Sequence, residues 1–135
     1  MVGAGLRARP DTSVWIAALR SADCREVEHL RSLLDDDRVA LAAPVRIEIL
    51  SGASAPDQDR LRPLLAALPN WMPERSTWAL IETWLASAAR VGQRFGMGDL
   101  LIAAIAAEHK APIWTLDTGF ERMAQMDWLE LHQPL

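Results

Sequence analysis

The sequence predicts an α/β fold built around a parallel sheet, and two stretches indicate it. Residues 100–107 are apolar at every position and follow Gly98 and Asp99, which is typical of a helix buried on nearly all sides. After Pro112, which cannot continue a helix, residues 113–116 form a short β-prone run. A buried helix that leads through a short link into an apolar strand is half of an α/β unit with a parallel sheet.

The whole chain, residues 1–135, is predicted to form one domain. Half of its residues are hydrophobic, which at this length supplies enough apolar side chains for a core. The single cysteine, Cys24, excludes an internal disulfide and a multi-cysteine zinc site. No apolar run approaches the roughly twenty residues that cross a membrane, and residues 1–10 lack the apolar core of a signal peptide. We therefore expect a cytoplasmic protein without a membrane partner.

The formal net charge of -4 argues against the broad basic face that gives many nucleic-acid binders their affinity. It does not exclude a nucleic-acid substrate, because acids that hold cations present a positive site once metal is bound. Of the 14 basic residues all but Lys110 are arginine, whose planar guanidinium suits phosphate contacts. Five arginines are candidates for such contacts or for pairing with acids: Arg7, Arg9, Arg46, Arg90 and Arg94.

The N-terminal segment gives the weakest signal. Residues 1–10 are not typical of a buried strand, because arginines alternate with the apolar residues and Pro10 cannot donate to a ladder. Asp11 and the two hydroxyl residues after it then supply capping groups for a helix over 14–19, and taken alone Asp11 is an N-cap. A second helix is predicted over 23–34.

Residues 39–43 form a second predicted buried strand, and Pro44 suits the first turn of the helix that follows. Within that helix Glu48 lies three residues after Val45 and one before Ile49, which places it in the apolar stripe. A carboxylate that points toward a core must be paired, protonated or bound to metal. A salt bridge to an arginine and a functional role both stay open for Glu48.

Further elements are predicted in the second half of the chain. They are an amphipathic helix over 57–68, a short edge strand at 71–72, a short helix over 120–126 and a final strand over 128–132. A long helix from Glu74 has an apolar face marked by Trp78, Ile81, Leu85, Ala88 and Ala89. Leu80 and Trp84 lie off that face, which indicates either a wide core contact, the favoured interpretation, or a partner surface.

Four acids occupy comparable places in this pattern: Asp11, Glu48, Asp99 and Asp117. Each follows a strand or lies in the first turns of a helix, so all four can converge at the edge of a parallel sheet where ligands bind. Without a cation, clustered carboxylates repel one another and some take up protons. Mg²⁺ or Mn²⁺, which prefer oxygen ligands, are the natural occupants, and metal-assisted phosphodiester hydrolysis is the favoured reaction.

Other catalytic schemes have less support in the sequence. Cys24 has no placed histidine partner, and neither a Gly-x-Ser-x-Gly elbow nor a Walker loop occurs. A receiver-like phosphoacceptor domain would need a lysine after a late strand, whereas Lys110 precedes one. Hydroxyl groups that could orient ligands or waters near the acids are those of Thr12, Ser13, Thr115 and Thr118.

Taken together, four segments resemble the PIN-domain ribonucleases, and more narrowly the VapC toxins of bacterial toxin–antitoxin pairs. They are Asp-Thr-Ser-Val-Trp-Ile at 11–16, Pro-Val-Arg-Ile-Glu-Ile-Leu at 44–50, Gly-Asp-Leu-Leu-Ile-Ala-Ala at 98–104 and Thr-Leu-Asp-Thr-Gly-Phe at 115–120. The resemblance covers residues 11–132. It implies a three-layer α/β/α sandwich with a central, mainly parallel sheet.

The same resemblance implies a Mg²⁺- or Mn²⁺-dependent endoribonuclease. The metal-binding acids would be Asp11, Glu48, Asp99 and Asp117, with Ser13 and Thr115 as supporting polar groups. It also implies a homodimer and a cognate antitoxin whose tail lies along the active-site groove. Candidate contact residues for these partners are Trp71, Met72, Leu80 and Trp84. Two alternatives stay open: a non-catalytic PIN module that binds protein or RNA, and a structure-dependent DNA nuclease of the flap type.

Overall fold

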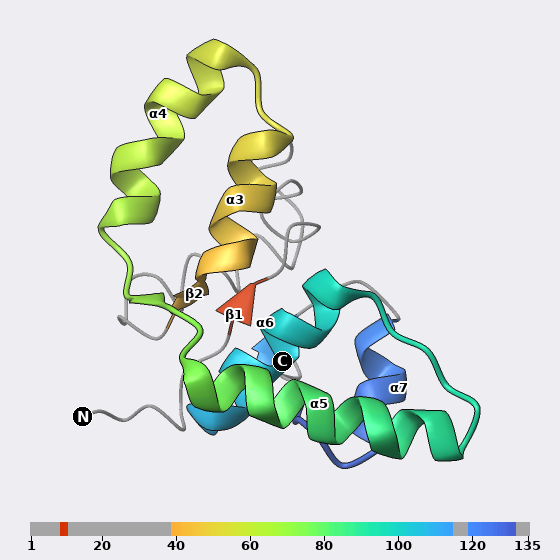
Figure 1. Ribbon diagram of the computed structural model, residues 1–135. Helices are drawn as coiled ribbons and strands as arrows, with labels where there is room; N and C mark the ends of the chain where they lie inside the picture. The colour runs from red at the N-terminus through yellow and green to blue at the C-terminus, as the bar shows by residue number, and fades with distance from the viewer. Residues whose placement is uncertain (1–8, 11–38, 115–118, 132–135) are drawn as a thin grey trace.

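The computed structural model describes residues 9–10, 39–114 and 119–131 (Figure 1). Its elements are β1 (Arg9–Pro10), β2 (Leu41–Ala42), α3 (Ala43–Ser51), α4 (Ala55–Ala66), β3 (Asn70–Trp71), α5 (Arg75–Arg90), α6 (Met97–Glu108), β4 (Ile113–Trp114) and α7 (Gly119–Gln125). The helices predicted over 14–19 and 23–34 lie outside the described residues.

Every strand pair in the described part of the chain is parallel. β1 pairs with β4 in a register that places Pro10 opposite Trp114, and β2 pairs with β3. Leu131 adds a parallel bridge to Ile113, which is all that the described residues show of the strand predicted over 128–132. The predicted α/β fold with parallel strands is therefore confirmed.

A strand forms at Arg9–Pro10 although its sequence is not typical of a buried strand. The residues that pair with it, Ile113 and Trp114, are apolar, and the fixed φ of proline is compatible with extended backbone. Proline is tolerated at strand positions where its missing N–H is not needed. The strand therefore depends on a partner about a hundred residues later in the chain, which the local sequence pattern does not reveal.

Helix α6 forms the centre of the core, as the sequence predicts. Leu100 and residues 102–106 are buried, while Leu101 and Ala107 are partly buried. The helix packs against α3, α5, α7 and β2. Figure 1 shows α5, α6 and α7 grouped together, with α3 and α4 as a helical pair that extends away from them. Along the described residues, no helix combines the length and the apolar character that a membrane crossing requires.

β2 leads directly into α3, so Pro44 lies in the first turn of that helix, as predicted. α4 begins two residues before its predicted start, because Ser54 Oγ caps it by accepting a hydrogen bond from the Asp57 N–H at 3.4 Å. The side-chain amide of Asn70 then donates to the carbonyl of Leu65 at 3.2 Å and of Leu68 at 2.7 Å. These bonds close the turn between α4 and the predicted edge strand, which is β3.

The buried face of α5 is rotated from the predicted one. The side chains of α5 that are buried are those of Thr77, Ile81, Trp84 and Ala88. Trp78 and Leu85, predicted to face the core, are 43% and 46% exposed. Trp84 is buried because its ring stacks on Trp128, with centroids 4.7 Å apart and planes at 4°. The favoured interpretation of Trp84 as a core residue is confirmed, and the predicted position of the stripe is wrong.

The residues predicted for a partner surface have different environments. Only Met72 is exposed, at 63%. Trp84 belongs to the core, Leu80 is partly buried against it, and Trp71 is half-buried. The Trp71 ring stacks on His109 with centroids 3.9 Å apart and planes at 2°. The large exposed apolar side chains of α5 are instead Trp78 and Leu85.

Thr77 is the buried polar side chain of the described core, and it joins the start of α5 to the end of α6. Its hydroxyl accepts a hydrogen bond from the Glu74 N–H at 2.9 Å and donates to the Glu108 carboxylate. Ser76 Oγ donates to the other oxygen of Glu108 at 2.6 Å. The carboxylate therefore lies at the N-terminus of α5, where the helix dipole favours negative charge. These contacts fix the C-terminal end of α6, and its opposite end carries Asp99.

Candidate functional site

Glu48 and Asp99 are the two predicted site acids that the structure describes. Glu48 lies on α3, and Asp99 lies in the first turn of α6. The two helices pack against each other. Glu48 Oε1 is 3.7 Å from the point that a Cβ on Gly98 would occupy, and Gly98 directly precedes Asp99. Two acids far apart in the sequence therefore lie on touching segments.

The local structure of α6 explains why Glu48 can approach it there. Gly98 has no side chain, so the Glu48 carboxylate lies close to the helix backbone. The first-turn N–H groups of a helix have no partner within the helix and carry partial positive charge. That charge favours carboxylates both within the first turn, where Asp99 lies, and beside it, where Glu48 lies. The start of α6 therefore favours negative charge at both positions.

Glu48 is exposed, which corrects its predicted place in the apolar stripe of α3. The buried residues of that helix are Val45 and Ile49, and Glu48 lies at the edge of their stripe on the side of α6. α3 packs on both α4 and α6. Burial therefore does not force this carboxylate to be paired or protonated, and its position beside Gly98 is the feature that points to function.

Asp11 and Asp117, with the supporting residues Ser13 and Thr115, lie outside the described residues. The strands that precede the two acids are described. β1 ends at Pro10 and β4 ends at Trp114, and these two residues are register partners in a parallel pair. The chain therefore enters the segments with Asp11 and Asp117 from neighbouring points on one edge of the sheet.

The donors that the site offers are oxygen atoms of carboxylates, which fit Mg²⁺ or Mn²⁺. In residues 39–114 and 119–131, no three His, Cys, Asp or Glu side chains are grouped to hold a metal ion, and two of the four predicted acids lie outside those ranges. His109 follows Asp99 by ten residues, which is about 15 Å along a helix at 1.5 Å per residue. His109, the histidine that the described residues include, therefore lies far from the start of α6 and adds no nitrogen ligand there.

Two exposed apolar side chains adjoin the acids in the sequence, and sequence reasoning missed both. Ile47, next to Glu48, is 64% exposed, and Met97, two residues before Asp99, is 68% exposed. Side chains one or two positions apart on a helix point in different directions, so this closeness is one of sequence. A signal for them exists in the sequence, since each lies off the buried stripe of its own helix.

Comparison with known proteins gives matches along most of the chain. Residues 10–126 match the PIN domain family model, a range that includes all four predicted acids. The chain is 31% identical over 128 residues to Ribonuclease VapC11 of Mycobacterium tuberculosis, covering 89% of this chain and 93% of that protein.

Two solved structures have a similar fold. VapBC2 from Rickettsia felis, bound to a DNA fragment from its promoter, has a TM-score of 0.74 at 18% identity, covering 93% of this chain and 96% of that one. FitAcB from Neisseria gonorrhoeae has a TM-score of 0.72 at 25% identity, covering 94% of this chain and 97% of that one.

Proposed function

The chain belongs to the PIN-domain family, and from this premise we propose that it is a divalent-metal-dependent endoribonuclease, the toxin of a bacterial type II toxin–antitoxin module. The observation that carries the proposal is the approach of Glu48 Oε1 to Gly98 at the start of α6, which brings a second acid-bearing segment to Asp99. The named ribonuclease relative, which matches over most of both chains, supports the same activity.

The proposed metal-binding residues are Asp11, Glu48, Asp99 and Asp117, with Ser13 and Thr115 as supporting polar groups. Glu48 and Asp99 would contribute carboxylates from touching helices. Asp11 and Asp117 would do so from segments that follow β1 and β4, whose last residues are register partners. A bound Mg²⁺ or Mn²⁺ would supply an activated water and would stabilise the charge that builds up on the phosphorus oxygens during hydrolysis.

The protein's own groups would position the RNA strand against these acids. The first turn of α6 presents backbone N–H groups, which attract the anionic phosphate. Ile47 and Met97, which are exposed and close to the acids in the sequence, would contact the apolar faces of bases or sugars that extend past the acids. These short-range contacts would give the affinity that a chain with a net charge of -4 does not obtain from a general basic surface.

The proposed partners are a structured RNA substrate, a cognate antitoxin and a second copy of the chain. The resemblance to VapC-type toxins, which act as one half of a protein pair, supports the antitoxin. We also propose that the chain acts in the cytoplasm as a single PIN domain. The solitary cysteine among 135 residues fits a reducing compartment.

We expect the purified chain to cleave structured RNA when Mg²⁺ or Mn²⁺ is present. Adding excess chelator should abolish cleavage, because the attacking water is then no longer activated, and restoring Mg²⁺ or Mn²⁺ should restore it. Gel analysis of a labelled RNA panel, with DNA of matching sequence and structure in parallel, makes the measurement. Cleavage that persists in chelator would contradict metal dependence, and equal cleavage of DNA would favour the flap-type nuclease. Failure to cut RNA, together with no uptake of Mn²⁺, would favour a non-catalytic module.

A further inference from the structure

One guanidinium group holds the loop that precedes Asp99. Arg122, on α7, donates from Nη1 to Gln93 Oε1 at 2.8 Å and to the Arg94 carbonyl oxygen at 3.3 Å. Its Cζ atom lies 4.6 Å from the centroid of the Phe95 ring. The side chain therefore contacts three successive loop residues: an amide, a backbone carbonyl and an aromatic ring.

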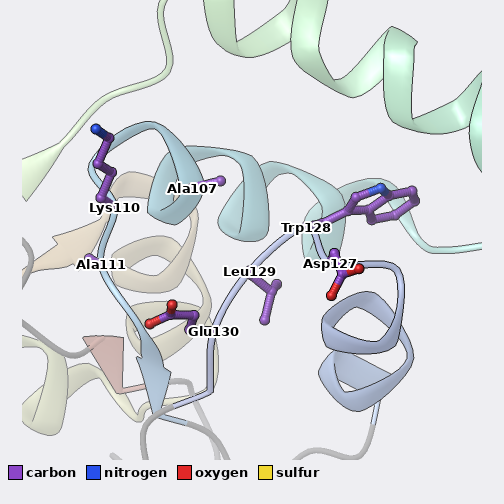
Figure 2. A pocket seen from close by; sticks show the side chains of 7 residues that line it. All are labelled: Ala107, Lys110, Ala111, Asp127, Trp128, Leu129 and Glu130. Atoms are coloured by element: carbon purple, nitrogen blue, oxygen red, sulfur yellow. The ribbon is translucent and has the colours of Figure 1, made fainter.

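The loop is fixed from its other side by stacked rings. Phe95 packs edge-on against Trp128, with centroids 5.3 Å apart and planes at 62°. Trp128, which Figure 2 labels, in turn stacks on Trp84 of α5. Because aromatic pairs in these arrangements are favourable beyond the area they bury, the Phe95 ring has one preferred position between Arg122 and Trp128. The loop thus joins α5, α7 and the segment after α7.

Arg122 also stands between two segments that carry predicted site acids. The loop that it holds ends at Gly96, the N-cap of α6, and Asp99 lies in the first turn of that helix. α7 begins at Gly119, two residues after Asp117, and is anchored in the core by Phe120. The same side chain therefore joins the segment that follows Asp117 to the segment that precedes Asp99.

We propose that Arg122 is a positioning residue, which fixes the loop before Asp99 against α7, the helix that begins two residues after Asp117. The effect of Arg122 on metal affinity rests on the proposed function, whereas its effect on the loop does not. An exposed arginine contributes little to global stability by charge pairing alone. Its value lies in the planar guanidinium group, whose Nη1 donates to two acceptors while its Cζ lies over the Phe95 ring, and the compact ammonium group of lysine lacks a flat face for that ring contact.

The test compares Arg122→Ala and Arg122→Lys with Arg62→Ala. Arg62 is a matched control, because it is also exposed and donates to two side chains, Asp59 at 3.1 Å and Gln58 at 3.3 Å, but on α4. Hydrogen exchange in metal-free protein should be faster at residues 93–99 and in α7 of Arg122→Ala only. Mn²⁺ affinity, measured by titration, should fall about tenfold, the effect typical of groups that orient ligands. Arg122→Lys should keep only part of the Mn²⁺ affinity that Arg122→Ala loses.

The two proposals fail in different ways. Arg122→Ala with unchanged exchange at residues 93–99 would overturn the positioning role, whatever the wild type binds. Faster exchange with wild-type Mn²⁺ affinity would also overturn it, because the loop would then have no bearing on the acids. A wild-type chain that takes up no Mn²⁺ would contradict the proposed function instead, and the exchange measurement alone would then decide whether Arg122 holds the loop.

Discussion

Asp99→Asn is expected to reduce RNA cleavage at least about 100-fold, because losing a group that only orients a metal ligand already costs about 10- to 100-fold. The substitution removes a charged oxygen donor from the first turn of α6 and keeps the size of the side chain. The unfolding free energy should change by less than about 1 kcal/mol. Lower repulsion with the nearby Glu48 carboxylate opposes the loss of a favourable interaction with the helix dipole.

The control for this experiment is Glu82→Gln, which neutralises an exposed carboxylate on α5. It should cleave RNA at the wild-type rate, since Glu82 is not among the proposed ligands. Initial rates at saturating Mg²⁺ should be compared with chemical denaturation of the same samples, so that an unfolded variant is not mistaken for an inactive one. Wild-type cleavage by folded Asp99→Asn would remove Asp99 from the site.

Ile105→Ala should lower the unfolding free energy by about 2–5 kcal/mol, the range for truncating a buried isoleucine to alanine. Ile105 is 0% exposed and lies on α6, which α3, α5 and α7 surround, so the cavity has little room to collapse. Urea denaturation at equilibrium measures the effect. Leu64→Ala, at a side chain that is 60% exposed on α4, should change stability by no more than about 0.5 kcal/mol.

Equal losses in the two variants would contradict the central place of α6 in the core. An unchanged unfolding free energy in Ile105→Ala would also contradict the central place of α6. The slope of unfolding free energy against urea should stay constant across the series, because it follows the surface exposed on unfolding. A changed slope in Ile105→Ala would mean that unfolding is no longer two-state, and the free energies could not then be compared.

Strong local patterns in the sequence predicted the elements that the structure confirms. The uninterrupted apolar run after Gly98 and Asp99 predicts a helix inside the core, and α6 is that helix. The helix ends at Glu108, before Pro112, and the apolar pair after Pro112 forms β4, in a parallel pairing as predicted. Placing Asp99 on the first turn followed from the same pattern.

Features that depend on tertiary partners were not predictable from local pattern. Trp84 is buried because Trp128 stacks on it, and the periodicity of α5 holds no information about a residue beyond α7. The rotation of that helix leaves Trp78 and Leu85 exposed. Glu48 stays a predicted site residue, but its predicted place in the apolar stripe of α3 is wrong, since it lies beside Gly98 without being buried.

The N-terminal strand shows the same limit for backbone pairing. Arg9 and Pro10 have little β propensity, and they form a strand because β4 supplies a parallel partner. That pairing aligns Pro10 with Trp114, the residues that lead into the segments of Asp11 and Asp117. Asp11 and Asp117 lie outside the described residues, so their convergence with Glu48 and Asp99 stays a prediction.

A titration of Mn²⁺, followed by the electron paramagnetic resonance signal of the free ion, tests this convergence most directly. Four single variants are compared with the wild type: Asp11→Asn, Glu48→Gln, Asp99→Asn and Asp117→Asn. If all four acids meet in one pocket, the wild type takes up Mn²⁺ and each substitution weakens binding, whereas Glu82→Gln does not. Wild-type affinity in folded Asp11→Asn or Asp117→Asn would contradict the account, because that acid would then lie apart from the site at the start of α6.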